Sequence, residues 1–450
     1  MSHSTNKKEN NMKWWQLSLF GVGCTIGTGF FLGSGIAIKT TGPSVLIAFL
    51  IAAVGTYFVF DALAKMTAKQ PEKGAFRTYA KKAYGRWAGF SIGWMYWSSE
   101  MLIMGSQLTA LSIFSQFWFP KIPLWVLAAV FAVLALAVLL IGSKGLNRLE
   151  NVFALIKIAA ILMFIIIALC ALSGVFGGIK GAETPTEYFP KGLWGLWSAL
   201  IFSYYAFGGI EVMGLMATQM KNPKEAPKAG KVMILLLTTI YVLSIGLAVI
   251  LVPWNKFSSE ESTFIIALNK YNIPFVSDIF NGALIIGGFS TMVASLFGVT
   301  SILVSLAQDG DAPPLFAREG KLKIPLPALL LAAIGLIASI VLSLVMPDRI
   351  YEYITTGAGL MLLYNWLFIL LSANQLLKPG FVDRTKYYIG MLFILLAVSG
   401  TILSKEIRPG FFISLGFITV IGIVALAMHF LWKNNDSNEL DTLFEKLEKP

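Results

Sequence analysis

The chain alternates between long apolar runs and short polar connections. About twelve runs of roughly 20 apolar residues follow one another, and a helix of that length crosses the hydrocarbon core of a bilayer. They begin near Trp14, Pro43, Trp87, Pro123, Asn151, Leu193, Ala229, Ile279, Leu326, Ile350, Tyr387 and Phe411. This pattern predicts an all-α integral membrane protein of about twelve transmembrane helices.

The apolar runs form one domain. No linker rich in Ser, Pro or charge divides them, so we expect a membrane domain at residues 14–432 between polar tails at 1–13 and 433–450. The polar start lacks the apolar stretch and cleavage site of a secretory signal. We therefore expect the first span to stay in the mature protein.

Two of the spans are interrupted by glycine. The first reads GVGCTIGTGFFLGSG, whose six glycines from Gly21 to Gly35 lower helix propensity at about mid-membrane depth. In the sixth span, FSYYAFGGIEVMG, Gly208 and Gly209 precede the carboxylate of Glu211. Glycines also let helices pack closely. However, interruptions at matching positions of two halves are the pattern of an inverted-repeat transporter whose site lies between the repeats.

A broken helix offers backbone groups that suit an amino acid. Amides at the start of a half-helix donate to a carboxylate at the positive end of the helix dipole. Carbonyls freed before each break accept from an ammonium, which we expect of Cys24, Thr25, Phe202 and Tyr205. We thus expect the substrate to contact Cys24, Thr25, Ile26, Gly27, Thr28, Gly29, Phe202, Tyr205 and Gly208.

Composition agrees with a membrane chain and narrows the function. Hydrophobic residues make up 56% and charged residues 13% of the chain, against about 25% charged in soluble proteins. The chain has only two histidines and two cysteines, Cys24 and Cys170, which are too few for a typical metal centre and offer few candidates for a nucleophile–histidine pair. We expect no cofactor, no metal and no enzymatic activity.

Basic residues are distributed unevenly between the two sides. Of the lysines and arginines outside the spans, 25 fall on the side of the N-terminus and 9 on the opposite side. The positive-inside rule therefore predicts cytoplasmic termini in an inner or plasma membrane. This asymmetry and anionic lipid account for the net charge of +11, so we expect no nucleic-acid partner.

Seven motifs occur in order along the chain. They are IGTGFFLGSG (26–35), TGPSVLIAF (41–49), P-x-x-G-A-F-x-x-Y-A (71–80), GWMYW (93–97), FGGIE (207–211), NPKEAPKA (222–229) and SLAQDGDAPPLFA (305–317). Through them the chain resembles, from Trp14 to Trp432, the amino acid-polyamine-organocation superfamily, most closely its bacterial amino acid permeases.

The resemblance implies the leucine-transporter fold, with five plus five helices in inverted repeat, the first and sixth broken, and two extra helices. Repeat one would span about 14–173, repeat two about 193–376, and the extra helices about 386–432. It also implies a gating acid, Glu211, and side-chain selection by the third, sixth, eighth and tenth helices. Several residues depart from the permease pattern: Lys65 replaces a usual glutamate, Ser301 an arginine and Gln219 an acid. In the third span Gln107 replaces a usual acid and Glu100 a usual aromatic residue.

Charged side chains inside the spans are functional candidates, because each costs from about 2.5 kcal/mol upward at mid-bilayer. Lys157 matches a lysine common in the fifth span of these permeases, where some proton-coupled members use an amine in place of a sodium ion. We expect it to couple transport to protons, the alternative being a lysine that snorkels to the nearby interface. Asp61, one turn before Lys65, is expected to form a local ion pair.

Side-chain selectivity is expected from the third and eighth spans. The candidates are Glu100, Met104, Gln107 and Phe297. Tyr96, Glu100 and Gln107 share one helical stripe, which should face the interior. Glu100 either contacts a cationic substrate or, as we favour, pairs with a nearby lysine.

The sequence thus predicts a secondary active transporter of amino acids that works by alternating access. The mostly apolar and aromatic candidates favour a neutral substrate, and a proton is the expected coupling ion. The carrier should act in the lipid bilayer as a monomer or homodimer. Two alternatives are an amino acid exchanger, possibly for cationic substrates, and a transport-inactive amino acid sensor.

Overall fold

The computed structural model describes residues 12–447, except residues 73, 141–142, 176–186, 260, 270, 272, 319–324 and 346–349. Most of the predicted N-terminal tail, residues 1–11, therefore lies outside the described part. The described chain is almost entirely helical, and its β-structure is one isolated parallel bridge between Met12 and Met220.

The helices follow the predicted apolar runs. The first half contains α1 (Trp14–Thr25), α2 (Thr28–Phe31), α3 (Gly33–Thr41), α4 (Val45–Lys69), α5 (Ala75–Tyr84), α6 (Arg86–Gln116), α7 (Leu124–Leu139) and α8 (Ser143–Leu172). The second half contains α9 (Gly192–Tyr205), α10 (Ile210–Met216), α11 (Ala226–Leu251), α12 (Thr263–Asn269), α13 (Val276–Gln308), α14 (Leu326–Val345), α15 (Ile350–Leu377), α16 (Phe381–Leu403) and α17 (Arg408–Leu447). Short 3₁₀ turns are η1 (Gly42–Ser44), η2 (Ala217–Gln219), η3 (Pro223–Glu225), η4 (Trp254–Lys256) and η5 (Pro314–Ala317).

Eight helical stretches of the described residues are long and apolar enough to cross a membrane. The helices at the other four predicted runs do not meet this criterion of length and hydropathy, and the reasons can be seen in each helix. α7 and α14 are shorter apolar helices, α1 has only 12 residues because the first span is broken, and α6 has 31 residues but carries many polar side chains. Twelve crossings therefore remain a prediction.

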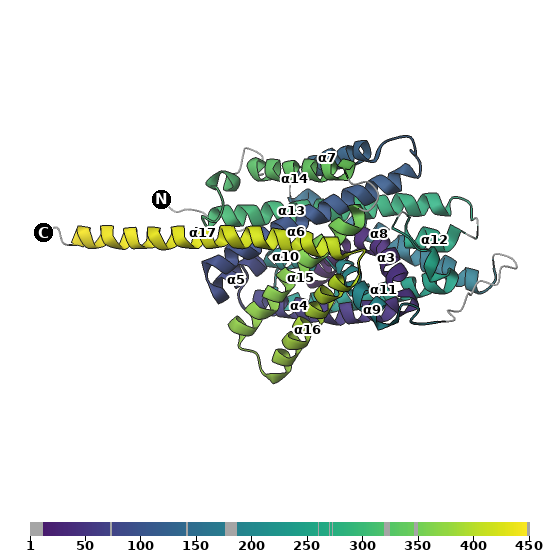
Figure 1. Cartoon of the computed structure of the whole chain (residues 1–450), viewed down its shortest axis with the longest axis horizontal. Coiled ribbons are helices and arrows are strands. Elements are labelled where there is room, and N and C mark those ends of the chain that lie inside the picture. The colour runs from purple at the N-terminus through teal and green to yellow at the C-terminus, as the bar shows by residue number, and fades with distance from the viewer. Residues whose placement is uncertain are drawn as a thin grey trace.

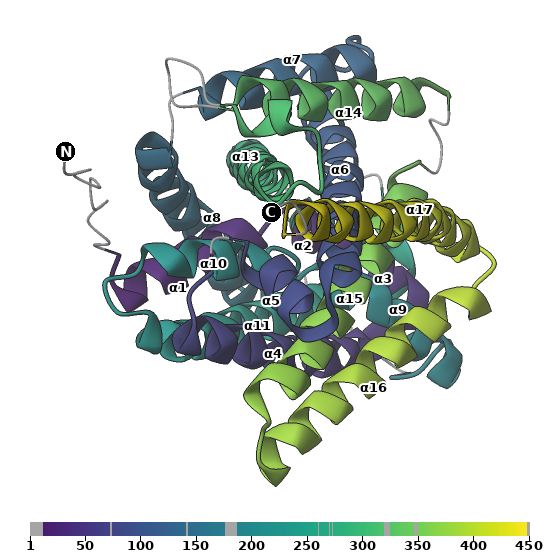
Figure 2. The ribbon, with the colours of Figure 1, turned by 90° about the vertical axis from the view of Figure 1, so that its left-hand side faces the viewer.

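The helices form an elongated bundle. Most run along its long axis, and the described chain begins and ends at the same end of the molecule (Figure 1). Viewed from that end, α7 and α14 pack side by side at one edge, and α5 lies near the centre (Figure 2). The last helix, α17, continues without a break to Leu447, beyond the predicted end of its span, and projects from the bundle (Figure 1).

Apolar side chains cover both the inside and the outside of the bundle. The interior holds one large buried cluster that includes the residues around both breaks. On the outside, Leu155 of α8, Leu330 of α14 and Phe430 of α17 are each about two-thirds exposed. Such an apolar outer surface is unfavourable in water. It suits the hydrocarbon of a bilayer.

Candidate functional site

The first break separates α1 from α2. Helix α1 ends at Thr25, and Ile26 and Gly27 take extended backbone conformations before α2 begins at Thr28. Amides in the first turn of a helix have no intrahelical partner. The amides of Thr28 and Gly29 are thus turned toward the break. The Thr28 carbonyl accepts a hydrogen bond of 3.1 Å from the buried Tyr351 hydroxyl on α15.

The second break separates α9 from α10. Gly209 has a φ of +105°, a conformation open to glycine at little cost. The Ala206 carbonyl is capped by the Tyr241 hydroxyl on α11, at 2.9 Å. Two expected free carbonyls are already engaged: Phe202 accepts from the amide of Ala206, and Tyr205 accepts from that of Gly208. The turn is tighter than predicted, so fewer backbone acceptors are free.

The two breaks touch each other inside the bundle. A Cβ added at Gly209 would lie 2.7 Å from the Cys24 carbonyl oxygen, so only a glycine allows this approach. Likewise, a Cβ at Gly29 would lie 2.8 Å from the ring of Tyr205. Residues about 180 positions apart in the sequence are thus brought into contact inside the bundle, whereas Gly208 faces Leu362 and the Tyr205 carbonyl instead.

Helix α13 covers the first break from the side. A Cβ at Gly27 would lie 2.6 Å from the Thr291 hydroxyl oxygen, and one at Gly288 would lie 2.8 Å from a carbon of Thr28. These α13 residues were not singled out in the sequence. A glycine and a threonine three residues apart carry no signal that distinguishes them from ordinary packing residues.

Glu211 holds the second break. Its Oε2 accepts from the backbone amide of Gly209 at 2.9 Å, and its Oε1 accepts from the indole Nε1–H of Trp366 at 3.0 Å. The carboxylate is fully buried. It therefore ties the α9–α10 break to α15, and Trp366 is a partner that the sequence did not indicate.

Lys157 joins α8 to the first broken helix. Its fully buried ammonium donates to the Gly23 carbonyl of α1. In an unbroken helix that carbonyl would accept from the amide of Gly27, but Gly27 lies beyond the end of α1. A snorkelling lysine keeps its charged end in water. The position of Lys157 is instead interior.

The expected stripe of α6 faces this centre. Tyr96, Glu100 and Gln107 are all buried, and the neighbouring Ser106 shares a hydrogen bond of 2.6 Å with the Tyr205 hydroxyl. We expected Glu100 to pair with a lysine, and this was wrong for the described residues, among which no ion pair involves it. Its Oε2 has no hydrogen-bond partner there.

The two remaining selectivity candidates lie to the side of the breaks. Met104 is buried in a separate apolar cluster formed by α6, α7, α13 and α14. Phe297 is only partly buried and packs against both that cluster and the main buried cluster. It is six residues after Thr291, which places it about a third of a turn around α13 from the face that covers the first break.

Asp61 forms the predicted ion pair. Its carboxylate lies 2.7 Å from the Lys65 ammonium, which also contacts Asp383 of α16 at 2.9 Å. Lys65 thus links α4 to α16. Two other departures from the permease pattern make local contacts: Ser301 donates to the Phe297 carbonyl within α13, and the Gln219 amide lies 3.5 Å from the sulfur of Met216.

A charged network that sequence reasoning missed joins α5 and the start of α6 to the end of α13. Arg77 of α5 is fully buried and contacts Asp309 at 2.8 Å and Asp311 at 2.6 Å, just after α13. Burial alone would raise the pKa of Asp309, but ion pairs with Lys81 and Arg77 outweigh it and hold that pKa below 3.8. Arg86 also contacts Asp311, at 2.7 Å. Arg77 belongs to the motif at residues 71–80, and Asp309 and Asp311 belong to the motif at residues 305–317. Opposite charges in two of the seven motifs could have indicated this network from the sequence.

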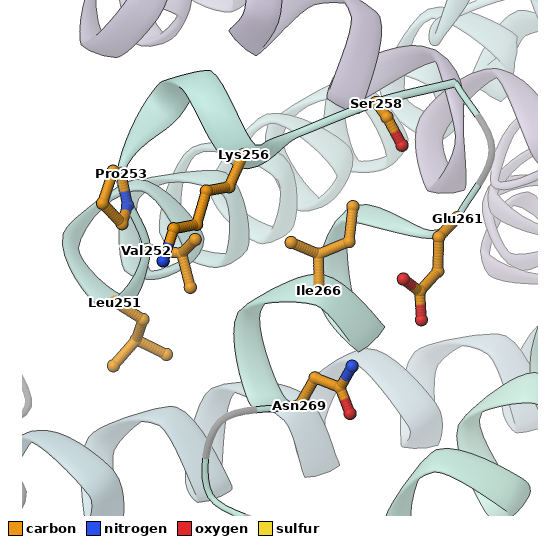
Figure 3. Close-up of a pocket in the computed structure, with 8 residues that line it drawn as sticks. All are labelled: Leu251, Val252, Pro253, Lys256, Ser258, Glu261, Ile266 and Asn269. Atoms are coloured by element: carbon orange, nitrogen blue, oxygen red, sulfur yellow. The ribbon is translucent and has the colours of Figure 1, made fainter.

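Among the hollows at the surface of the described part of the bundle are two that are not lined by residues of the breaks. One, of about 440 Å³, lies between the end of α11 and α12. Figure 3 shows Lys256 and Glu261 on opposite sides of it, with Ile266 between them. Burial raises the pKa of Glu261 above 4.5. We call the arrangement described above, in which the two breaks touch each other, the closed conformation.

An apolar-surfaced helical bundle with two touching helix breaks defines a multi-pass membrane protein, and transporters with discontinuous helices belong to this class. The comparison with known families identifies the class further. The family model "Amino acid permease" matches residues 16–405. The chain belongs to this family, whose members are transporters and not enzymes.

Several relatives cover nearly the whole chain. An uncharacterized transporter, YcgH of Bacillus subtilis (strain 168), is 57% identical over 426 residues, 94% of this chain and 95% of its own length. YtnA of the same organism, an uncharacterized amino acid permease, is 32% identical over 82% of each chain. The aromatic amino acid transport protein AroP of Escherichia coli (strain K12) is 28% identical over 94% of this chain and 95% of its own length.

Proposed function

We propose that this permease is a secondary active transporter that carries a neutral amino acid, apolar or aromatic, together with a proton. The observation that carries the proposal is the contact between the two helix breaks: the Gly209 backbone lies against the Cys24 carbonyl, and Gly29 lies against Tyr205. A small movement of either half-helix would open a space lined by backbone donors and acceptors. That lining suits the carboxylate and ammonium shared by all amino acids.

The proposed substrate class rests on the residues around this contact. Phe202, Tyr205 and Ile103 are buried apolar or aromatic side chains, and Tyr205 packs with Ile103 in one small cluster. The name of the relative AroP agrees with an aromatic substrate. We propose that Cys24, Thr25, Ile26, Gly27, Thr28 and Gly29 bind the substrate backbone, and that Glu100 and Gln107 contribute to side-chain selection.

The proposed architecture is two inverted repeats, at about residues 14–173 and 193–376, followed by two extra helices. The described chain begins and ends at the same end of the bundle (Figure 1), which supports an even number of crossings. Together with the excess of basic residues on that side, it supports cytoplasmic termini.

A second candidate is a carrier or exchanger of cationic amino acids. The observation that favours it is the buried Glu100 carboxylate, which has no ion-pair partner among the described residues. A positively charged substrate side chain would pair with it. Thermal stabilisation of the purified protein by each of the twenty amino acids separates the candidates, because a ligand that binds the folded state raises its stability.

Flux measurements in proteoliposomes then test the mechanism. A proton symporter accumulates the stabilising amino acid when a pH gradient is imposed, does not need sodium, and stops when a protonophore is added. An exchanger needs substrate on the opposite side and ignores the gradient. A sensor binds without flux. Sodium-dependent uptake would contradict the proposed coupling.

Lys157 is the proposed proton carrier. When protonated, its ammonium holds α8 against the Gly23 carbonyl, and proton loss would release the contact. Lys157→Met keeps the bulk of the side chain but binds no proton. We expect it to retain substrate binding and to lose accumulation driven by the pH gradient.

The matched control is Lys121→Met, which changes an exposed lysine in the α6–α7 turn and should leave uptake unchanged. Gradient-driven accumulation by Lys157→Met would show that this lysine only anchors α8 to α1.

A further inference from the structure

The second surface hollow gathers lysines from three separate segments. It has a volume of about 690 Å³ and lies between the end of α3, the start of α9, η4 and the α16–α17 turn. Helices α3, α9 and α16 pack together on the same side of the molecule (Figure 2). Lys39, Lys191 and Lys405 line the hollow, and Glu406 is its one acid.

Three lysines against one glutamate leave the hollow with a net positive charge. All three belong to the side predicted to face outward, where the chain has only 9 basic residues. The positive-inside rule applies to orientation and does not favour lysines there. No ion pair in the described part of the chain involves any of the three. Their convergence therefore points to an anion supplied from outside the chain.

The rim of the hollow is aromatic and apolar. Lys191 lies over the Trp254 ring, 5.5 Å from its centroid. Trp194 is 64% exposed and stacks on Trp197, with 5.6 Å between ring centroids. The adjacent Leu193 is 72% exposed. Tryptophan is typical of the level of the lipid headgroups, so the hollow lies where phosphate meets acyl chain.

We propose that this hollow binds the phosphate of an anionic phospholipid in the outer leaflet. The three lysines surround the phosphate, and the acyl chains lie on the apolar surface beside Leu193 and Leu403. A free phosphate would use the lysines but gain nothing from this apolar rim.

The position of the hollow links lipid binding to transport. Lys39 is on α3, which follows the first break, and Lys191 directly precedes α9, which leads to the second break. One lipid headgroup thus bridges the outer halves of both broken helices. An occupied site should hold these halves together, so anionic lipid should change the rate of transport and not only protein stability.

The binding test uses the purified full-length protein. Its thermal stability is titrated with phosphatidylglycerol, with phosphatidylcholine of the same acyl chains, and with inorganic phosphate. We expect phosphatidylglycerol to stabilise the protein most. A lysine near a membrane surface strengthens anionic lipid binding about fivefold. The triple variant Lys39→Gln, Lys191→Gln, Lys405→Gln should therefore weaken it by on the order of 100-fold.

Two further variants separate binding from folding effects. Glu406→Gln removes the one acid of the hollow and should strengthen phosphatidylglycerol binding, an effect that a damaged fold does not produce. Lys121→Gln changes an exposed lysine outside the hollow and should have no effect. Unchanged binding in the triple variant would overturn the proposal, as would equal stabilisation by phosphatidylcholine. Equal stabilisation by inorganic phosphate would assign the hollow to a free anion instead.

Discussion

Replacing Glu211 with glutamine tests whether its carboxylate gates the transport cycle. Both carboxylate oxygens accept hydrogen bonds, one from the amide of Gly209 and one from Trp366. A glutamine has a single oxygen, so it can keep only one of these bonds. Its NH₂ group then faces the other N–H donor. The variant changes no volume and leaves the apolar surroundings intact.

The free energy by which Glu211→Gln destabilises this arrangement follows from the kind of hydrogen bond that is lost. A hydrogen bond to a charged group contributes about 1.5–3 kcal/mol. If both bonds form only in the closed conformation described above, Glu211→Gln lowers the population of that conformation by about 10- to 150-fold relative to the open ones. We expect substrate to bind and turnover to fall by a similar factor, because the cycle must pass through the closed state.

Trp366→Phe is the matched variant. It removes the indole donor but keeps an aromatic ring beside Tyr204, whose ring centroid lies 6.1 Å away. One hydrogen bond to Glu211 is lost, but no two donors are brought face to face. We therefore expect turnover to fall less than in Glu211→Gln, by about fivefold to tenfold. The effects of the two changes on turnover should be less than additive in the double variant, since both act on the same contact between the carboxylate and the indole.

Binding is measured by ligand-induced thermal stabilisation, and turnover by uptake into proteoliposomes. The gating interpretation requires the two readouts to separate: near-normal binding with slow uptake. Wild-type turnover in Glu211→Gln would refute it and leave the acid as a cap of the α10 end. Equal loss of binding and uptake would show that the carboxylate supports the site in all conformations.

Three other changes are expected to have distinct effects. Gly27→Val should abolish substrate binding at near-normal expression, because the amides freed at the break must approach the substrate carboxylate closely and a side chain there would block them. Normal affinity by thermal shift would remove Gly27 from the site. Arg77→Leu should lower stability by about 3 kcal/mol, since it leaves the buried Asp311 with Arg86 alone, and an unchanged melting temperature would contradict this. Because the pKa of Asp309 is lower in the folded state, its ionised carboxylate stabilises the fold above pH 3.8. This stabilisation is lost as the pH falls through the pKa that Asp309 has in the folded protein. The melting temperature of Asp309→Asn should therefore fall less on acidification than that of the wild type.

Local sequence was sufficient for the helices and for the positions of the breaks. A run of about 20 apolar residues must form a helix in lipid, because its backbone groups find no other partners there. Glycine lowers helix propensity wherever it occurs. Both properties belong to short stretches of chain, and so the ends of α1 and α9 fall close to the predicted interruptions.

The partners of the buried polar groups were decided by the tertiary structure. Trp366 is 155 residues from Glu211, and Lys157 is 134 residues from Gly23. Such contacts depend on which faces of docked helices meet, and no local propensity encodes that. The expected lysine partner of Glu100 failed for this reason: helix periodicity places the acid on the inner face of α6, but packing decides what stands opposite. The lysines of the outer hollow likewise come from segments that only the assembled bundle brings together.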